Sequence, residues 1–233
     1  PRESFVLADK LSPNSFSKEE DIRPVFDEML EACGVEYFDY FLMHAQSSNN
    51  YQKYCDCRAY EIGAELRAEG KIKHLGFSFH DKADMLDRIL TEYPEVEFVQ
   101  IQFNYLDYND ESVEGRKCYE VCRKHDKPII VMEPVKGGSL VNLPPAAQKV
   151  LDRLEGGSNA SYAIRFAAGF EGIHMVLSGM STLEMVEENC RTASEAAPGY
   201  LTEKDFEVLE EVKRQIREKE KVGCTGCGYC MPC

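Results

Sequence analysis

The sequence has no hydrophobic stretch that approaches the roughly 18 consecutive apolar residues of a membrane span. No segment reads as a signal peptide either, at the start of the chain or later. Basic residues are scarce, because 27 Lys and Arg stand against 41 Asp and Glu and give a formal net charge of -14. An acidic surface repels phosphate backbones and anionic lipids, so nucleic acids and membranes are not expected as partners. We expect a cytoplasmic protein.

Apolar residues, in contrast, are plentiful. They make up 43% of the 233 residues, which is too many for a disordered polymer and enough for a sizeable core. The length allows one large domain or two small ones. The chain opens at Pro1 just before a strand-like segment, and it stops at Cys233 within a group of cysteines. Neither end looks like a natural terminus, so we expect an excerpt of a longer protein.

Short apolar runs alternate with amphipathic segments along the chain. The apolar runs predict six strands, at residues 5–11, 38–44, 72–79, 98–104, 129–134 and 173–178. Helices are predicted between and after these strands, at residues 17–33, 59–68, 81–90, 113–125, 159–168, 183–193 and 201–221. Capping boxes are expected at the start of two of these helices, from the pairs Ser17 with Glu20 and Thr202 with Asp205. A repeat of roughly 30 residues predicts parallel βαβ units.

Two architectures fit this alternation, a doubly wound sheet and a (β/α)8 barrel. A doubly wound dinucleotide fold would have a Gly-x-Gly-x-x-Gly turn after its first strand, and this sequence has none. Polar residues instead follow several predicted strands, as in a barrel whose site is built from strand ends. These residues are Lys10, His44, Ser78, His80, Gln102, Asn104, Glu133, Ser178 and Ser181. The barrel is favoured, with six of its eight units present.

Four segments of the chain resemble the aldo/keto reductase family, in the right order and at the right spacing. They are similar to its third strand, its fourth strand, its next helix–strand junction and its cofactor phosphate loop, at residues 2–10, 40–44, 66–78 and 177–189. The cysteine-rich end resembles the bacterial branch of the family that carries a ferredoxin-like extension. The resemblance implies an α/β fold with an incomplete (β/α)8 TIM barrel that contains strands 3–8. Its expected parts are the partial barrel, a helix or linker and the start of a 4Fe-4S segment, at residues 1–200, 201–222 and 223–233.

The resemblance also implies which residues act on a carbonyl group. Lys10 corresponds to the family's catalytic lysine, whose ammonium lowers the pKa of a neighbouring tyrosine, and His44 to the histidine that orients the carbonyl. The tyrosine and an aspartate of the same tetrad lie upstream of the lysine strand in the family. Nothing precedes Pro1 in this sequence, so we expect the chain as given to lack its proton donor and to be inactive.

A nicotinamide cofactor is implied by further matches. Gln102 corresponds to the residue that binds the nicotinamide amide, and Met132 stands where the family usually has a stacking aromatic. The expected cofactor-binding residues are Ser78, Gln102, Ser178, Gly179, Met180, Ser181, Glu188 and Asn189. Members that prefer NADPH have basic residues where this chain has Gly179 and Met185, so NADH is slightly favoured. An ordinary strand-to-helix turn remains the alternative for the loop.

Four of the ten cysteines crowd into the end of the chain, at Cys224, Cys227, Cys230 and Cys233. Three C-x-x-C steps let their thiolates converge on one centre, and a long, core-rich chain does not suit a secreted disulfide scaffold. The ferredoxin pattern has a longer last gap, so Cys233 arrives one residue early. Zinc is the competing ligand, but paired zinc motifs usually have a longer spacer. A [4Fe-4S] cluster is therefore predicted.

The expected function is hydride transfer between a nicotinamide cofactor and a small carbonyl or alcohol substrate, with the cluster carrying electrons to a redox protein. The first alternative is a non-catalytic, nucleotide-binding redox sensor or accessory module that presents its cluster to a partner. The second is a zinc hydrolase, which the lack of a His, Asp or Glu ligand set at the strand ends argues against.

Overall fold

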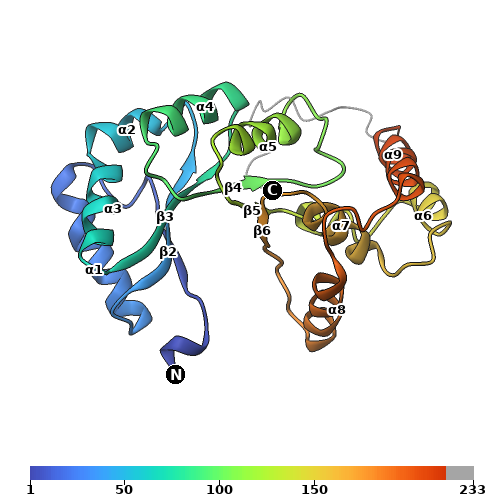
Figure 1. Ribbon diagram of the computed structural model, residues 1–233, viewed down its shortest axis with the longest axis horizontal. Helices are drawn as coiled ribbons and strands as arrows, with labels where there is room; N and C mark the ends of the chain where they lie inside the picture. The colour runs from blue at the N-terminus through green and yellow to red at the C-terminus, as the bar shows by residue number, and fades with distance from the viewer. Residues whose placement is uncertain (219–233) are drawn as a thin grey trace.

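Six parallel strands form one sheet, and their order across the sheet is their order along the chain (Figure 1). The structure is a computed structural model that describes residues 1–218. The strands are β1 (Ala8–Leu11), β2 (Phe38–Gln46), β3 (Ile72–Phe79), β4 (Phe98–Gln102), β5 (Ile129–Met132) and β6 (Ile173–Val176). Sequential order is typical of a (β/α)8 barrel, whereas a doubly wound sheet reverses its order at a switch point. The prediction of barrel-type topology is therefore confirmed.

Helices connect the strands, and α1 to α5 lie together on one side of the sheet (Figure 1). Within residues 1–218, none of the helices is both long and apolar enough to cross a membrane. The described part of the chain also contains the short 3-10 helices η1 (Arg2–Ser4), η2 (Glu19–Asp21) and η3 (Lys136–Gly138). The α-helices are α1 (Ile22–Cys33), α2 (Tyr51–Asp56), α3 (Ala59–Ala68), α4 (Ala83–Glu92), α5 (Gly115–Lys124), α6 (Pro145–Leu151), α7 (Asn159–Ala168), α8 (Leu183–Glu195) and α9 (Glu203–Arg217).

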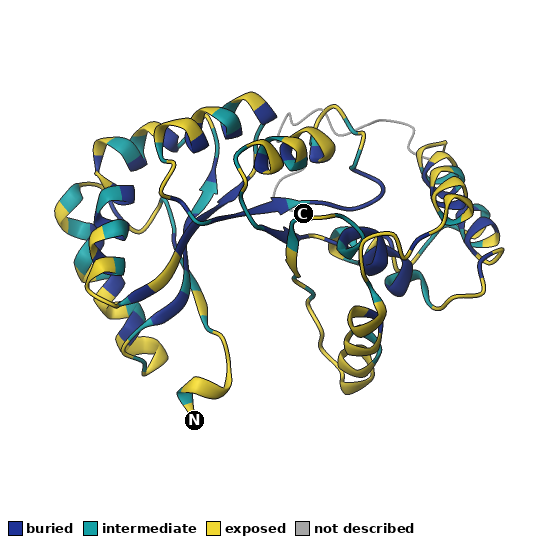
Figure 2. Ribbon diagram, viewed as in Figure 1, coloured by how far each residue is buried: buried dark blue, intermediate teal, exposed yellow. Residues whose placement is uncertain are grey.

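The hydrophobic core lies between the sheet and the helices. Within each strand, side chains point alternately to the two faces of the sheet. Those on the helix side, such as Phe41 of β2 and Phe77 of β3, belong to this core. On the opposite face Leu42, Phe98 and Ile130 form a small separate cluster. Figure 2 shows that β2 to β5 are largely buried, whereas β6 and the outer helix surfaces are more exposed, with α8 exposed along most of its length. The face away from the helices, which we call the inner face, is therefore free to carry polar residues near the strand ends.

Most predicted elements match the structure, and the differences occur at their ends. The capping box of Thr202 and Asp205 at α9 is confirmed. The predicted box of Ser17 and Glu20 is wrong, because the carboxylate of Asp21 accepts the hydrogen bond of the Ser17 N–H at 2.8 Å. The first helix accordingly begins as η2, and α1 proper starts at Ile22.

The helices α2 and α6 are not predicted from the sequence, which reads as a polar loop where α2 lies. A helix of six or seven residues is not stable alone, so tertiary contacts must supply its stability. In α2 the side chains of Tyr51 and Tyr54 are buried and pack against Tyr60 of α3, with ring centroids 6.3 and 6.5 Å away. These contacts depend on residues that no local pattern brings together.

Candidate active site

The carboxyl ends of β1, β2 and β3 bring two of the expected catalytic residues together. Lys10 lies opposite Leu42 in the β1–β2 register, two residues before His44, and both Lys10 and His44 are half-buried. Burial lowers the pKa of His44 below its ordinary value, and the positive charges of Lys10 and His80 lower it further. The imidazole is therefore neutral at pH 7 and can donate one hydrogen bond to a ligand while accepting another.

Contacts from two other elements hold His44 in place. The Oγ of Ser12, just after β1, lies 2.8 Å from Nδ1 of the imidazole. The hydroxyl of Tyr54, on α2, lies 2.8 Å from the carbonyl oxygen of Leu11 and 2.9 Å from that of His44. Because Tyr54 is fully buried, these contacts tie the ends of β1 and β2 to each other.

The backbone bends immediately after His44. Ala45 has a φ of 54°, in the left-handed region, and the register between β2 and β3 shifts between Met43 and Gln46. The N–H of Ala45 donates to Oγ of Ser78 at 2.8 Å, and Nδ2 of Asn50 donates to the Ala45 carbonyl at 2.8 Å. Ser78, expected to contact the cofactor, thus accepts one hydrogen bond from the backbone, and its hydroxyl proton and second lone pair are left for a ligand.

A buried polar network that the sequence does not reveal surrounds Gln102. The Nε2 of Gln102 donates to Oδ2 of Asp107 at 2.7 Å, and Nδ2 of Asn104 donates to the same oxygen at 2.9 Å. The other carboxylate oxygen lies 2.5 Å from Nζ of Lys136, and the Asp107 side chain is only 3% exposed. Asp107 lies in the loop after β4 and Lys136 begins η3 after β5, so no spacing rule would have paired them.

Gln100 is a second polar residue that the prediction missed. It lies next to Ser78 in the β3–β4 register, and its Nε2 is 3.2 Å from Sδ of Met132 on β5. Gln100 is only 5% exposed, and a thioether is a weak hydrogen-bond acceptor. The side-chain amide of Gln100 is therefore able to donate to a stronger acceptor on a ligand. The sequence could have revealed Gln100, because side chains two residues apart on a strand lie on the same face, and Gln102 was already expected at the site.

A cleft of about 770 Å³ opens between the ends of β5 and β6 and helices α7 and α8. Four of the expected cofactor residues line it together with Met132, namely Ser178, Gly179, Glu188 and Asn189. Within it, Nδ2 of Asn189 donates to Oγ of Ser178 at 3.1 Å. The structure therefore brings together residues of the predicted phosphate loop and the residue expected to lie under the nicotinamide.

Four of the expected cofactor residues are not in this group: Ser78 and Gln102, which lie on β3 and β4, and two residues of the predicted phosphate loop. Met180 lines a neighbouring cavity of about 370 Å³ between α7, β6 and α8. Ser181 is exposed, and its Oγ contacts Sδ of Met185 at 3.8 Å. Both residues are exposed and lie just before Thr182, the N-cap of α8.

The charges around the cleft are acidic. Its described lining contains Glu133 and Glu188, and no lysine or arginine is among those described lining residues. At the start of α8 a hydrogen bond from its own backbone N–H lowers the pKa of Glu184, so a carboxylate occupies part of the helix N-terminus. No described side chain there offers a positive charge to a second phosphate.

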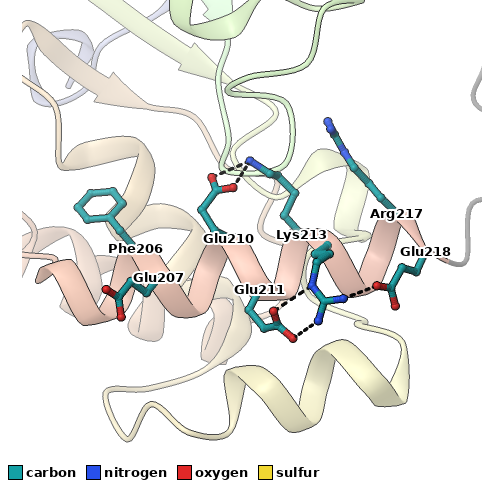
Figure 3. A pocket seen from close by; sticks show the side chains of 8 residues that line it. Phe206, Glu207, Glu210, Glu211, Lys213, Arg217 and Glu218 are labelled. Carbon is teal, nitrogen blue, oxygen red and sulfur yellow. Dashed lines mark hydrogen bonds and ion pairs between the residues drawn. The ribbon is translucent and has the colours of Figure 1, made fainter.

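Helix α9 contacts the loop that carries Asp107. Figure 3 shows that Glu210 pairs with Lys213 and that Arg217 points away from the ion pairs of the helix. Glu211 and Glu218 both pair with Arg214. Arg217 instead donates to the carbonyl oxygen of Leu106 at 3.2 Å and to Asp110 at 2.8 Å. The end of α9 thereby holds the loop after β4.

The cysteines expected to bind a cluster, Cys224, Cys227, Cys230 and Cys233, lie outside the described residues. Among residues 1–218 no group of three or more His, Cys, Asp or Glu side chains is placed to hold a metal ion. The other six cysteines, all within this part of the chain, are free thiols.

The comparisons with known proteins identify the class. Residues 1–214 match the model of the Aldo/keto reductase family. This chain therefore belongs to the aldo/keto reductase family of oxidoreductases. A comparison with curated proteins finds no match.

Solved structures of aldo/keto reductases share the fold. The holo form of an aldo-keto reductase from Bacillus halodurans has a TM-score of 0.69 and 19% identity, over 91% of this chain and 73% of that one. An aldo/keto reductase from Klebsiella pneumoniae in complex with NADP and acetate has a TM-score of 0.66 and 18% identity, over 92% and 71%. One from Brucella melitensis has a TM-score of 0.65 and 19% identity, over 91% and 74%.

Proposed function

We propose that this chain binds a nicotinamide cofactor and takes part in hydride transfer between it and a small carbonyl or alcohol substrate. The observation that carries the proposal is that the cleft and the Lys10–His44 pair share the carboxyl edge of one sheet. Ser78, Gln100 and Met132 continue the inner face from His44 to the cleft. A ligand that fills the cleft would therefore place one end beside His44.

The residues present suit a dinucleotide. No atom lies within 4 Å of where a Cβ on Gly179 would be, so the loop leaves room for a phosphate against its backbone. Asn189 and Ser178 offer side-chain hydrogen bonds beside it. At the other end Met132 provides an apolar surface for a flat ring, and Gln100 has an amide without a strong partner. When bound, the nicotinamide would supply or accept the hydride.

The chain's own residues would polarise the substrate. A neutral His44 that accepts from Ser12 at Nδ1 can donate from Nε2 to a carbonyl oxygen, where negative charge develops in the transition state. The ammonium of Lys10 stabilises the same charge and, by the family resemblance, acts through a tyrosine. Lys10 and His44 are thus proposed as catalytic residues, and the substrate class as small carbonyl compounds.

NADH is proposed as the preferred form. The acidic lining and the carboxylate of Glu184 disfavour the extra phosphate of NADPH. The Klebsiella pneumoniae structure contains NADP, so family membership alone does not set this preference. The direct test is to measure the dissociation constants of NADH and NADPH, and we expect the constant for NADH to be the smaller.

A [4Fe-4S] cluster on Cys224, Cys227, Cys230 and Cys233 is proposed from their spacing, as a route for electrons to a redox protein. Anaerobic reconstitution with iron and sulfide, followed by metal analysis, tests it. Iron and sulfide in equal amounts would support the cluster, whereas zinc alone would favour the zinc alternative.

The main experiment is an anaerobic titration of the chain with NADH, NADPH and ADP-ribose, followed by nucleotide fluorescence or calorimetry. Asn189→Ala should weaken binding of all three, whereas Ser194→Ala, on the same helix but bonded only to the Cys190 carbonyl, should not. Lys10→Met should leave NADH binding intact, because Lys10 is assigned to the substrate and not to the cofactor. Turnover is measured on the chain extended upstream to include the family's tyrosine, where Lys10→Met should abolish it. Saturable binding with no turnover by that extended chain would instead favour the non-catalytic alternative.

A further inference from the structure

The imidazole of His80 carries an inference that rests on the proposed function. His80 comes directly after β3, two residues beyond Ser78, so its side chain lies on the inner face. Its backbone N–H donates to the Gln46 carbonyl at 3.0 Å, which continues the ladder between β2 and β3. The imidazole itself has no hydrogen-bond partner among the described residues, so both of its nitrogens are available to a ligand.

A bulge in β2 leaves room between His44 and His80. In a regular strand Gln46 would share the inner face with His44, since side chains two residues apart point the same way. The extra residue at Ala45 breaks this alternation and turns Gln46 to the side of the helices. There its Oε1 accepts from the hydroxyl of Tyr60 at 2.9 Å, and both side chains are fully buried. The space between the two imidazoles is therefore not filled by Gln46.

The spacing of the two imidazoles sets the size of a ligand that contacts both. Met43 pairs with Phe77, so His44 is level with Ser78, and His80 lies two residues further along β3. Neighbouring strands lie about 4.8 Å apart and two residues add about 6.6 Å, so the two Cα atoms are roughly 8 Å apart. Two hydrogen bonds of about 2.8 Å, with two oxygens on adjacent carbons between them, also span about 8 Å. A carbonyl oxygen bound by His44 thus places an oxygen of the next carbon at His80.

The charges around His80 favour a neutral group over an anionic one. Burial lowers the pKa of His80, the negative charge of Glu133 opposes this, and the positive charge of Lys10 lowers the pKa further. The imidazole is therefore neutral at pH 7, with one donor and one acceptor nitrogen. A hydroxyl group can bind either nitrogen, whereas a carboxylate can only accept and is repelled by Glu133.

The backbone holds Glu133 in this place. Its φ is 57°, in the left-handed region that residues other than glycine rarely adopt. Its carbonyl oxygen accepts from Nδ2 of Asn104 at 3.1 Å and from the N–H of Lys136 at 3.1 Å. Strained residues of this kind persist where the surrounding structure fixes them, and they cluster at ligand sites. The carboxylate of Glu133 thus belongs to the site and does not swing away from it.

We propose that His80 is a substrate-binding residue that contacts a hydroxyl group on the carbon next to the reacting carbonyl, so that small hydroxy-ketones and hydroxy-aldehydes are preferred. His44 binds the carbonyl oxygen and His80 the hydroxyl oxygen. The substrate then lies along the inner face from β2 to β3, and the hydroxyl group selects it among carbonyl compounds of the same size.

The test compares two ketones of equal size in NMR titrations of the chain saturated with NAD+. Hydroxyacetone has a hydroxyl group where 2-butanone has a methyl group, and we expect it to bind about fivefold to tenfold more tightly, as for one additional hydrogen bond. His80→Phe should abolish this preference, whereas His80→Gln, whose amide can still donate and accept, should keep part of it. His74→Phe, near the start of the same strand, is the control and should keep the full preference.

ADP-ribose and pyruvate separate the possible failures. If the unmodified chain binds neither NAD+ nor ADP-ribose, the proposed function is wrong. If it binds them but shows no preference for hydroxyacetone, or binds neither ketone, or if His80→Phe keeps the preference, the cofactor site stands and this inference is overturned. Pyruvate has a carboxylate next to its carbonyl and should bind more weakly than hydroxyacetone. Tighter binding of pyruvate would likewise overturn the inference.

A second measurement is needed if His80→Phe no longer binds NAD+ and so has lost its fold. In the unmodified chain, the 15N NMR signals of the His80 imidazole, assigned with His80→Gln, report its hydrogen bonds directly. Hydroxyacetone should shift these signals and 2-butanone should not. Equal shifts with both ketones, or no shift with either, would place the hydroxyl group away from His80 and overturn the inference.

Discussion

The Oγ of Ser12 lies 2.8 Å from Nδ1 of His44, although the two residues are 32 positions apart. The contact joins the segment after β1 to the end of β2, at the edge of the sheet where Lys10 also lies. A neutral imidazole that accepts from Ser12 at Nδ1 carries its proton on Nε2. A serine hydroxyl can donate or accept, and we assign Ser12 as the donor, which leaves Nε2 of His44 to donate to a ligand.

We expect 15N NMR of the imidazole to show His44 neutral at about pH 7, with the proton on Nε2. Ser12→Ala should give a mixture of the two tautomers, because Nδ1 then has no fixed donor. The exposed Ser17→Ala is the control and should leave the spectrum unchanged. A proton found on Nδ1 in the unmodified chain would reverse the assigned direction of the Ser12 hydrogen bond.

Two buried tyrosines offer a matched comparison. The Tyr54 hydroxyl contacts the carbonyl oxygens of Leu11 and His44, whereas the Tyr105 hydroxyl has no described partner. We expect Tyr54→Phe to lower the free energy of unfolding by about 1–2 kcal/mol, because it removes the hydroxyl hydrogen bond to the carbonyl of the buried Leu11, and Tyr105→Phe to change it by less than about 0.5 kcal/mol. Urea denaturation measures both. Equal losses would show that the Tyr54 contacts add nothing beyond burial.

Asp39 links stability to pH. Burial alone would raise its pKa, but hydrogen bonds from Lys73, the Leu7 N–H and Arg2 outweigh burial and hold the pKa well below its usual range. A carboxyl whose pKa is lowered on folding stabilises the protein above its unfolded pKa, and this stability is lost as the pH falls. We expect Asp39→Asn to cost about 2 kcal/mol near neutral pH.

That difference between Asp39→Asn and the unmodified chain should shrink as the pH falls from about 5 to 2. Asp27→Asn is the control, because Asp27 pairs with Lys71 at an exposed site and should cost less than about 0.5 kcal/mol. Urea denaturation across this pH range measures both variants. A cost of Asp39→Asn that does not vary with pH would contradict the assigned ion pairs.

Gly179 allows cofactor preference to be changed. Because no atom lies within 4 Å of its Cβ position, a side chain fits there without moving the loop. We expect Gly179→Lys to raise the affinity for NADPH relative to NADH by about fivefold to tenfold, and less so at high salt. Gly179→Met adds similar bulk without charge and should leave the ratio unchanged. An equal rise in relative NADPH affinity with Gly179→Met would show that the 2′-phosphate of NADPH does not bind beside residue 179.

Arg217 and Arg214 lie on the same helix but contact different elements. Arg217 reaches Leu106 and Asp110, whereas Arg214 pairs with Glu211 of α9 and with Glu218, its C-cap. We expect Arg217→Gln to speed hydrogen exchange in residues 105–114, because the loop loses its anchor, while Arg214→Gln leaves the exchange unchanged. Unchanged exchange in both variants would mean that the loop is held by its own network.

The sequence by itself determined the alternation of strands and helices, and with it the topology. Hydrophobic periodicity is local, so strands such as β3 and helices such as α3 lie where predicted. The missing glycine motif correctly argued against a doubly wound sheet. Placing Lys10 and His44 at neighbouring strand ends was also within reach, because parallel strands end at the same edge.

Only the tertiary structure decided how these residues are held. Tyr54 binds the ends of β1 and β2 from α2, a helix that is stabilised by tertiary packing. Asp107 pairs with Lys136, which is 29 positions away in the sequence. Such pairs leave no periodic signal, because neither partner belongs to a repeating local pattern. The orientation of the Gln102 amide depends on its contact with Asp107, and so it could not be seen before the chain was folded.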